Sequence, residues 1–242
     1  CDSAVITVPA NSRGLARYRT KVCAGLAEIE PLALINEPTA AAMAYGSQQT
    51  AGNQMVLVFD FGGGTLDVTM LEARDGMFFE QASAGVARLG GLDIDNSILR
   101  HIADETPNAD QWTGADRARI RLEIERAKIQ LSNSGLDEIV IVDDVLPGFR
   151  LTRARFNELV KPLIERSRGA IERVLGDVGM GQGSVDTLLL VGGSSNVPTV
   201  QQFVSEIVGL EPAGGVDPMT AVGEGAAVAA AILTGELQDS DF

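Results

Sequence analysis

Two acids, three consecutive glycines and a threonine lie within eight residues, in the segment Asp60-Phe61-Gly62-Gly63-Gly64-Thr65-Leu66-Asp67. Glycines allow the backbone to approach an anion closely and to turn its N–H groups toward it. Asp60 follows an apolar strand and is placed to hold a hydrated Mg²⁺, a cation that takes carboxylate and water ligands. Thr65 can donate to a terminal phosphate, and Asp67 can orient a water molecule. These residue types in this order predict a loop that binds phosphate groups.

The surroundings of the glycine run distinguish this loop from the P-loop of many nucleotide-binding proteins. A P-loop joins a strand to a helix and carries Gly-Lys-Ser/Thr, whereas this run joins two predicted strands and has no lysine nearby. The alternative is a glycine-rich hairpin whose flanking acids are solvated. Because three consecutive glycines weaken a bare hairpin, we favour the phosphate-binding interpretation.

A second turn, Leu190-Val191-Gly192-Gly193-Ser194-Ser195, lies between a predicted strand and a predicted helix. Ser195 or Asn196 can cap that helix, and Pro198 suits its first turn. The amides at the start of the helix can bind phosphate or face a sugar. Close packing of the strand against the helix explains the two glycines equally well, so both interpretations stay open.

The segment Asn36-Glu37-Pro38-Thr39 marks another junction between a strand and a helix. Asn36 is a natural cap, and Pro38 suits the first helical turn. Glu37 has two interpretations. It either compensates the helix dipole or, if phosphates lie opposite, acts as a base or positions water.

Three polar residues, Glu125, Lys128 and Ser132, share one face of a predicted helix at positions i, i+3 and i+7. That face lies roughly a quarter-turn from the apolar stripe of the same helix, given a step of about 100° per residue. Such a trio can hydrogen-bond a ribose and the edge of a base. Taken in isolation, a solvated helix face is the simpler interpretation.

Hydrophobic periodicity and turn residues predict the elements that position these groups. An α/β segment comes first, followed by an antiparallel meander around the glycine loop and the Asp75-Gly76 turn. A charged helical region and a final α/β segment complete the chain. The predicted strands are 4–8, 32–35, 55–59, 66–72, 77–84 and 187–191. The predicted helices are 12–26, 38–45, 117–131, 155–175, 198–208 and 221–233, with a polar connector at 46–53.

Three other features have structural interpretations. Small residues at 40–44 and 223–231 allow helix backbones to pack closely, which suits a crossing beneath a hinge. His101, the only histidine, has no partners at ligand spacing and is interpreted as structural or exposed. Trp112, near Pro107 and Gly114, is expected in a loop.

The chain is acidic, with a formal net charge of −14. This charge argues against nucleic-acid binding, because a phosphate backbone is neutralised by clusters of Lys and Arg, but it permits a single nucleotide. Two cysteines without a Cys-x-x-Cys spacing favour a reducing compartment, which we expect to be the cytoplasm. The longest apolar stretch, 226–233, is too short for the ~20 residues that cross a bilayer. We therefore expect no membrane partner.

Taken in order, these segments closely resemble the heat-shock protein 70 family, the DnaK-type chaperones. The resemblance covers essentially the whole chain, and eight matching pieces in sequence leave little room for chance. The pieces are Val5-Ile6-Thr7-Val8-Pro9-Ala10, Ile35-Asn36-Glu37-Pro38-Thr39-Ala40-Ala41-Ala42, the 60–67 loop, Leu89-Gly90-Gly91, the 125–132 segment, Thr152-Arg153-Ala154-Arg155-Phe156, Val191-Gly192-Gly193-Ser194 and Gly225-Ala226-Ala227-Val228.

This resemblance implies an α/β fold of the actin-like ATPase (ribonuclease H-like) type, mostly lobe II with a remnant of lobe I. It implies a site for ATP or ADP with Mg²⁺ between two lobes and slow hydrolysis in the full-length protein. It also implies unfolded polypeptide clients and co-chaperones as partners. The water-positioning, Mg²⁺-shell and phosphate-contacting residues that it implies are Glu37, Asp60, Thr65 and Asp67, with Gly62, Gly63 and Gly64 in the loop. The adenosine contacts that it implies are Glu125, Lys128, Ser132, Gly192, Gly193 and Ser194.

The resemblance also implies a division of the chain and a coupling residue. The division is 1–50 for the remnant of lobe I, 51–91 and 160–219 for the two parts of the lobe II core, 92–159 for an insert subdomain and 220–242 for a C-terminal helix returning to lobe I. Arg17 falls on the lobe I arginine that the family uses, with Pro9, to couple nucleotide state to its substrate domain.

Several departures from the family pattern bear on function. Asn196 stands where the family has an adenine-stacking arginine, so a guanidinium plane is lost. Leu92 replaces the acid of the Gly-Gly-Glu-Asp motif, and the segment 133–151 is shorter than in DnaK. The family's first phosphate loop, its catalytic lysine and its interdomain linker do not occur in the sequence. We therefore expect an excerpt of a longer protein, with little or no hydrolysis by this chain alone.

Two other functions stay open at this point. A nucleotide-sensing or partner-binding module without turnover is motivated by Asn196 and Leu92. A sugar kinase of the same superfold is a third possibility, because fold does not fix function. The 36–39 and 125–132 segments resemble chaperones specifically, which disfavours the kinase.

Overall fold

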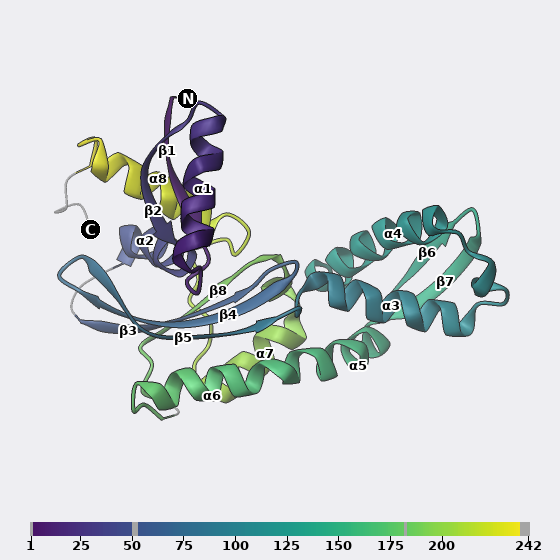
Figure 1. The fold of residues 1–242 in the computed structure, drawn as a ribbon. Helices are drawn as coiled ribbons and strands as arrows, with labels where there is room; N and C mark the ends of the chain where they lie inside the picture. Colours follow the sequence, from purple (N-terminus) through teal and green to yellow (C-terminus); the bar gives the residue numbers. More distant parts are fainter. Residues whose placement is uncertain (1, 50–52, 182, 238–242) are drawn as a thin grey trace.

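The protein is described by a computed structural model over residues 2–49, 53–181 and 183–237. It is a mixed α/β molecule with three visible parts (Figure 1). The first unit stands over one face of a central sheet, helices cover the opposite face, and an arm projects to one side. Within the described residues, no helix combines the length and the apolar character needed to cross a bilayer.

The first unit begins with a parallel pair of strands. β1 (Ser3–Val8) and β2 (Glu30–Asn36) are hydrogen-bonded to each other. α1 (Gly14–Leu26) forms the crossover between them, as parallel pairing requires. These elements agree with the predicted strands and helix, and they place the carboxyl ends of β1 and β2 at the same edge.

Two helices of small residues complete the first unit. α2 (Glu37–Gln49) follows β2 directly, and α8 (Ala221–Leu233) crosses it. At the crossing, a Cβ on Gly225 would lie 1.7 Å from the carbonyl oxygen of Ala40. Only glycine permits this approach, which confirms the predicted close packing.

The predicted connector at 46–53 is wrong in its first half. α2 continues through Gln49, because the glutamines at 48 and 49 are good helix formers that extend the helix past Gly46. Residues 50–52 of the predicted connector lie outside the described residues.

The central sheet has the order β5-β4-β3-β8. The predicted antiparallel meander is confirmed: β3 (Gln54–Phe61), β4 (Thr65–Arg74) and β5 (Met77–Ala87) follow one another. β8 (Thr187–Val191) adds in parallel to β3 and is buried along its whole length. The hairpin between β3 and β4 therefore lies beside the end of β8.

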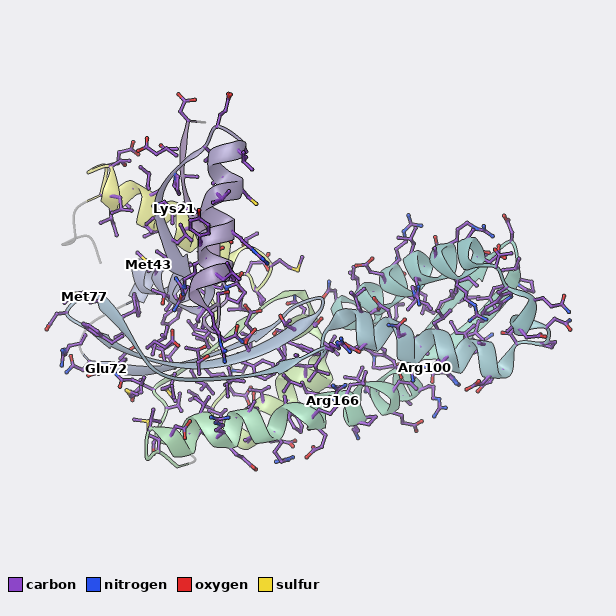
Figure 2. The ribbon with its side chains drawn as sticks, in the orientation of Figure 1. Lys21, Met43, Glu72, Met77, Arg100 and Arg166 are labelled. Carbon is purple, nitrogen blue, oxygen red and sulfur yellow. The ribbon has the colours of Figure 1, made fainter. Side chains whose placement is uncertain are left out.

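Helices cover the lower face of the sheet in Figure 1. They are η2 (Glu165–Ser167), α6 (Arg168–Asp177) and α7 (Pro198–Val208). α5 (Arg153–Ile164) packs against α7 and continues this layer beyond the sheet, beneath the arm. Side chains fill the space between this helix layer and the strands (Figure 2). The labelled Glu72 and Met77 lie on the strands and the labelled Arg166 on the helix layer, at the outside of the molecule. Leu57, Phe59 and Phe61 of β3 are completely buried in the space between the layers.

The single helix predicted at 155–175 is interrupted. The 3₁₀ turn η2 separates α5 from α6 shortly after Pro162, which cannot donate a backbone hydrogen bond. The buried hydroxyl of Ser167 donates to the carbonyl oxygen of Ile164 at 2.6 Å. This bond gives the backbone a partner that competes with the regular helical ladder.

The arm consists of two helices and a short hairpin. Its elements are α3 (Gly91–Glu105), η1 (Ala109–Gln111), α4 (Gly114–Asn133), β6 (Glu138–Asp143) and β7 (Leu146–Thr152). The predicted apolar stripe of α4 is buried. The sequence patterns named neither α3 nor the hairpin. The boundary predicted between 159 and 160 falls inside α5.

Two residues of the arm are structural. The ring of His101 packs edge-on against Phe149, with 5.4 Å between centroids, and its Nε2 accepts a hydrogen bond from Arg155. Trp112 lies outside a helix, as predicted, but it is buried in the main core rather than in an open loop. The guanidinium of Arg117 lies over its ring, 5.8 Å from the centroid.

Candidate functional site

The glycine run forms the tip of the β3–β4 hairpin, and its carbonyl groups are bonded inward. The carbonyl oxygen of Gly62 accepts from the amide of Gly91 at 3.0 Å and from the hydroxyl of Ser194 at 2.9 Å. The carbonyl oxygen of Gly63 accepts from the amide of Leu92 at 2.9 Å. The hairpin is thus fixed against the start of α3 and the turn after β8.

The amide side of the same hairpin is open. Among the described residues, the amides of Gly63 and Gly64 have no protein acceptor. A Cβ on either residue would meet no atom within 4 Å, and neither has a positive φ. The protein's own packing therefore does not require glycine here, whereas an anion lying against the backbone would.

Gly90 supports the hairpin from behind. A Cβ on Gly90 would lie 2.4 Å from the carbonyl group of Gly63 and from the amide nitrogen of Gly64. Prediction from the glycine loop alone missed this residue, although the matching piece Leu89-Gly90-Gly91 contained it. Its role is to allow the loop to rest on the start of α3.

Three carboxylates face one another beside the tip of the hairpin: Glu37 begins α2, Asp60 is near the end of β3, and Asp67 pairs with Asp60 across the hairpin. Burial raises the pKa of Asp60 to about 7, with further contributions from the charges of Glu37 and Asp67. Burial and the charge of Asp67 raise the pKa of Glu37, and burial raises the pKa of Asp67. Thr65 is exposed at the start of β4. The cluster is a concentration of negative charge that a cation would relieve.

The cluster fits a hydrated magnesium ion better than a fully protein-bound metal. Within the described residues, no three side chains of His, Cys, Asp or Glu converge on one metal position. Mg²⁺ keeps several waters and is usually bound through one or two carboxylates. The half-buried carboxylate of Asp60 offers such a ligand.

The turn after β8 packs against this cluster. Gly192 has a φ of 83°, and a Cβ there would lie 2.5 Å from the carbonyl oxygen of Phe61 and 2.9 Å from Oδ1 of Asp60. Gly192 is therefore required sterically, behind the site rather than in it. This explains one glycine of the turn by close packing, one of the two interpretations that the sequence left open.

The predicted cap of the following helix is wrong. Gly193–Asn196 form a 3₁₀ turn, η3, and Val197 occupies the cap position of α7 without a side-chain hydrogen bond. The hydroxyl of the buried Ser195 donates instead to the carbonyl oxygen of Val191 at 2.6 Å, so it is not available to cap the helix. Pro198 is in the first turn, as predicted.

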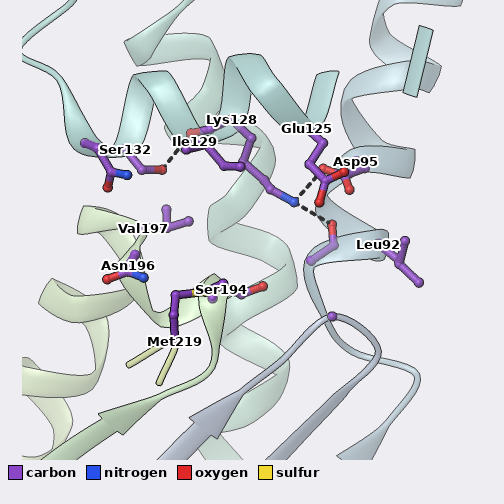
Figure 3. A pocket seen from close by; sticks show the side chains of 14 residues that line it. Leu92, Asp95, Glu125, Lys128, Ile129, Ser132, Ser194, Asn196, Val197 and Met219 are labelled. Carbon is purple, nitrogen blue, oxygen red and sulfur yellow. Dashed lines mark hydrogen bonds and ion pairs between the residues drawn. The ribbon is translucent and has the colours of Figure 1, made fainter. Parts of the chain in front are cut away.

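A cavity of about 370 Å³ opens beside the hairpin (Figure 3). It is lined by the first turns of α3, one face of α4, η3 and Met219. Six residues predicted from the sequence line it together: Gly63, Glu125, Lys128, Ser132, Gly193 and Ser194. The predicted shared face of Glu125, Lys128 and Ser132 thus borders a cavity rather than bulk solvent alone.

Lys128 is already paired inside this cavity. Its Nζ donates to Oδ1 of Asp95 at 2.7 Å and lies 3.4 Å from the carbonyl oxygen of Gly91 (Figure 3). Burial raises the pKa of Asp95, and the hydrogen bond from Lys128 opposes this shift. Ser132 donates to the carbonyl oxygen of Lys128 at 2.8 Å. Lys128 and Asp95 therefore neutralise each other, and the carboxylate of Glu125 is the other charged group on this wall.

The rim of the cavity is apolar and was only partly foreseen. Leu92, Ile129 and Met219 are 61%, 50% and 67% exposed, respectively, and all three line the cavity. Asn196 lies on the same wall as Met219 (Figure 3). The sequence patterns did not single out Asp95, Ile129 or Met219. Ile129 adjoins Lys128 and Asp95 is three residues from Leu92, whereas Met219 carried no sequence signal, because it reaches the cavity only through its contact with Gly193.

Arg17 and Asn36 are neighbours at the edge of the first unit. The Arg17 guanidinium donates through Nη2 to Oδ1 of Asn36 and through Nε to the carbonyl oxygen of Ser12. Asn36 Nδ2 in turn donates to Oε2 of Glu80 on β5 at 2.7 Å. Arg17 therefore lies one residue away from the carboxylate cluster rather than in it.

Comparison with known proteins gives consistent matches along the whole chain. The family model described as "Hsp70 protein" matches residues 1–242. Chaperone protein DnaK of Thermus thermophilus is 42% identical over 98% of this chain and 40% of its own length. The DnaK proteins of Thermoplasma acidophilum and Methanothermobacter thermautotrophicus are 39% and 38% identical over 98% of the chain, and in each case 41% of the relative is covered. The chain thus spans about 40% of the length of these curated relatives.

Proposed function

Because this chain belongs to the Hsp70 family, we propose that it forms the nucleotide-binding part of a DnaK-like molecular chaperone ATPase. The fold that this proposal assumes is the actin-like ATPase fold, with the first unit as part of lobe I and the central sheet and arm as lobe II. The residue division given by the sequence is kept as part of the proposal. The observation that carries it is the hairpin tip, where the amides of Gly63 and Gly64 have no protein acceptor among the described residues and an added Cβ would meet no atom within 4 Å.

The hairpin residues Gly62, Gly63 and Gly64 would hold the phosphate groups of ATP or ADP. The carbonyl groups of Gly62 and Gly63 are bound by the start of α3 and by Ser194, so the amides that follow them, those of Gly63 and Gly64, point the other way. Two adjacent amides of this kind form a concave donor surface that suits an anion. Thr65, exposed at the next position, would donate to the terminal phosphate.

The carboxylate cluster would organise the cation and the water. Asp60 would bind Mg²⁺ through its hydration shell, and Glu37 and Asp67 would orient water near the terminal phosphate. The cation supplies charge neutralisation between these acids and the phosphate groups. Glu37 and Asp67 have raised pKa values, and such groups can accept a proton from water more readily than ordinary carboxylates. Catalysis of this type depends on positioning and charge stabilisation.

The cavity beside the hairpin would hold the nucleoside. Glu125, Lys128 and Ser132 on one wall and Gly193 and Ser194 on the other would contact the ribose and base, with Gly192 behind the turn. A volume of about 370 Å³ is at the lower end of typical small-molecule sites, consistent with one nucleoside. Hydrolysis would be slow.

The parent protein would act on unfolded polypeptides together with co-chaperones in the cytoplasm. This part of the proposal rests on the relatives named DnaK, of which the chain covers about 40%. The net charge of −14 disfavours nucleic acid as a partner.

A nucleotide-sensing or partner-binding module without turnover is the second candidate. Two observations favour it. Asn196 and Leu92 line the cavity where an arginine and an acid are expected from the family pattern. The ammonium group of Lys128 is already bound by Asp95. ATP that stays intact for hours while tightly bound supports this candidate, and measurable single-turnover hydrolysis removes it.

The decisive test is the double substitution Gly63→Ala, Gly64→Ala. Because a Cβ at either position meets no atom within 4 Å, the variant should fold with an unchanged unfolding temperature. The two methyl groups would occupy the space of the phosphates, so the affinity for Mg-ADP should fall at least tenfold, or about 1.4 kcal/mol. Calorimetry measures the affinity, and circular dichroism measures the unfolding temperature.

Gly169→Ala is the matched control, since a Cβ there also meets no atom within 4 Å. It lies on α6, away from the cleft, and should bind Mg-ADP like the unmodified protein. Unchanged affinity in the double variant would contradict phosphate binding by the hairpin.

A further inference from the structure

Asn11 connects the first unit to the carboxylate cluster. It lies just after β1, in a turn closed by a bond of 2.9 Å from the amide of Ser12 to the carbonyl oxygen of Pro9. Its side-chain Nδ2 donates to Oδ1 of Asp67 at 2.9 Å, across 56 residues of sequence. A residue of one part of the molecule thus contacts one of the three facing carboxylates of another part.

The Asp67 carboxylate is confined on a second side by Gly85. These two residues are paired on β4 and β5, and a Cβ on Gly85 would lie 2.5 Å from the same Oδ1 that accepts from Asn11. The absence of that Cβ gives the carboxylate its position over the Gly85 backbone. The amide of Asn11 then fixes the direction of the carboxylate within that space.

We propose that Asn11 is a positioning residue that holds the carboxylate of Asp67 in the orientation required beside the terminal phosphate. This inference rests on the proposed function, which assigns water positioning to Asp67. Asn11 acts through Asp67 and does not itself touch the reacting atoms. Because it belongs to the first unit, the orientation of Asp67 depends on how that unit sits on the sheet.

A second hydrogen bond between the first unit and the sheet provides a comparison. It distinguishes an effect on Asp67 from a general loss of contact between the two parts. Asn36 lies at the end of β2, the strand parallel to β1, and its Nδ2 donates to Glu80 on β5 at 2.7 Å. Glu80 does not contribute to the shifted pKa values of Glu37, Asp60 or Asp67. The two hydrogen bonds therefore join the same parts, but only the one from Asn11 ends on the cluster.

The test uses the whole chain without ligand, with aspartate carboxyl groups labelled with ¹³C. Asn11→Ala should move the Asp67 carboxyl resonance, and Asn11→Gln, which keeps the amide, should return it toward its original position. Gly85→Ala should also move it, because the new Cβ displaces the carboxylate, and should speed the exchange of the Asn11 amide protons with water. Glu80→Ala, which breaks the other hydrogen bond, should leave the resonance unchanged.

An Asp67 resonance that is the same in Asn11→Ala and the unmodified protein overturns the proposal. A resonance that moves equally in Glu80→Ala also overturns it, because the effect would then be general loosening. Thermal unfolding identifies any variant that fails to fold. If Asn11→Ala does, the exchange rate of the Asn11 amide protons decides the question, since faster exchange in Gly85→Ala than in the unmodified protein supports the bond to Asp67 and equal rates overturn it.

Calorimetry separates this proposal from the proposed function. Asn11→Ala should weaken Mg-ADP binding about threefold, the size expected for one exposed hydrogen bond, and Asn11→Gln should restore it. If the unmodified chain does not bind Mg-ADP, the proposed function fails, whereas the carboxyl resonances still report whether Asn11 orients Asp67.

Discussion

The two ends of the candidate site treat charge in opposite ways. At the hairpin end, Glu37, Asp60 and Asp67 face one another, and the pKa of Asp60 is raised to about 7 by burial and by its acidic neighbours. At the cavity end, Asp95 is also buried, but Lys128 donates to it at 2.7 Å. The carboxylates of the hairpin end therefore require a cation from outside, while the buried carboxylate of the cavity end is neutralised by a lysine of the chain itself.

The glycines of the two ends also differ in what requires them, a ligand or the protein's own packing. A Cβ on Gly63 or Gly64 would meet open space, so the reason for glycine lies outside the protein. A Cβ on Gly91 would lie 2.8 Å from the hydroxyl of Ser194 and 3.2 Å from Nζ of Lys128, so the reason there is internal packing. The comparison indicates that the hairpin end is shaped for a charged ligand and the cavity end is already packed before a ligand binds.

The largest expected effect concerns the ion pair of the cavity end. Lys128→Met removes the cation and leaves the carboxylate of Asp95 buried without its partner. Breaking such a pair from one side costs about 3 kcal/mol or more, which chemical denaturation can measure. Replacing both partners, with Asp95→Leu and Lys128→Met, should recover most of that stability.

Lys161→Met provides the control for this loss, because Lys161 is exposed on α5. It should change the free energy of unfolding by less than about 0.5 kcal/mol. A loss below about 1 kcal/mol in Lys128→Met would mean that the cavity end is not stabilised by the pair, and the contrast between the two ends would disappear.

The second effect is a pH dependence of the free energy of unfolding, which originates at the hairpin end. The folded protein holds a proton on Asp60 up to about pH 7, whereas the ordinary pKa is 3.8. The stabilisation that comes from the protonated Asp60 is therefore fully present below pH 3.8. It decreases as the pH rises from 3.8 and is lost once the pH has passed through 7, where Asp60 is ionised in the folded protein as well. Between pH 5 and 8 the loss should be up to about 3 kcal/mol, at about 1.4 kcal/mol for each pH unit below the folded pKa.

Denaturation at pH 5, 6, 7 and 8 measures this loss, and Asp60→Asn should remove most of it. Saturating Mg²⁺ should also reduce it at pH 7 and 8, since the cation stabilises the ionised carboxylates. A profile that is the same in Asp60→Asn and the unmodified protein would show that the hairpin end does not carry uncompensated charge.

The third effect is on nucleotide affinity. Asp60→Asn should weaken binding of Mg-ADP by about 30-fold, or about 2 kcal/mol, because a charged ligand for the hydrated cation is lost. In EDTA the two proteins should bind ADP alike. Asp75→Asn, in the distant β4–β5 turn where asparagine tolerates the positive φ of 53°, is the control.

The sequence predicted the elements of the central sheet well because alternating and continuous apolar runs report local burial. The meander, β8, α7 and α8 are found within a few residues of their predicted bounds. The β6–β7 hairpin was not named, and neither was α3, although its buried Ile94, Ile98 and Ile102 recur at helical spacing. Local patterns also misassigned the cap before α7, because the 3₁₀ turn at Gly193–Asn196 moves the cap position of the helix to Val197 and the hydroxyl of Ser195 is bound to Val191.

The missing parts of the candidate site are contacts between distant segments. Lys128 was predicted as a polar residue on a helix face, but its partner Asp95 lies 33 residues away and is brought near only by the packing of α3 on α4. Gly90 is defined by its approach to Gly63, and Met219 by its approach to Gly193. No spacing within one segment contains this information.

The smallest expected effect isolates the apolar rim of the cavity. Met219 is 67% exposed, and a Cβ on Gly193 would lie 2.7 Å from its sulfur. A base entering the cavity would cover part of this side chain. Met219→Ala should therefore weaken ADP binding about fivefold, or about 1 kcal/mol, with no change in the unfolding temperature. Binding of Mg-tripolyphosphate, which has no base, should be unchanged.

Met77→Ala is the matched control, because Met77 is also exposed but lies at the β4–β5 turn. It should leave both affinities unchanged. Equal losses for ADP and tripolyphosphate in Met219→Ala would mean that the rim acts on the phosphate groups. The two ends of the site would then act as one unit rather than as a charged end and an apolar one.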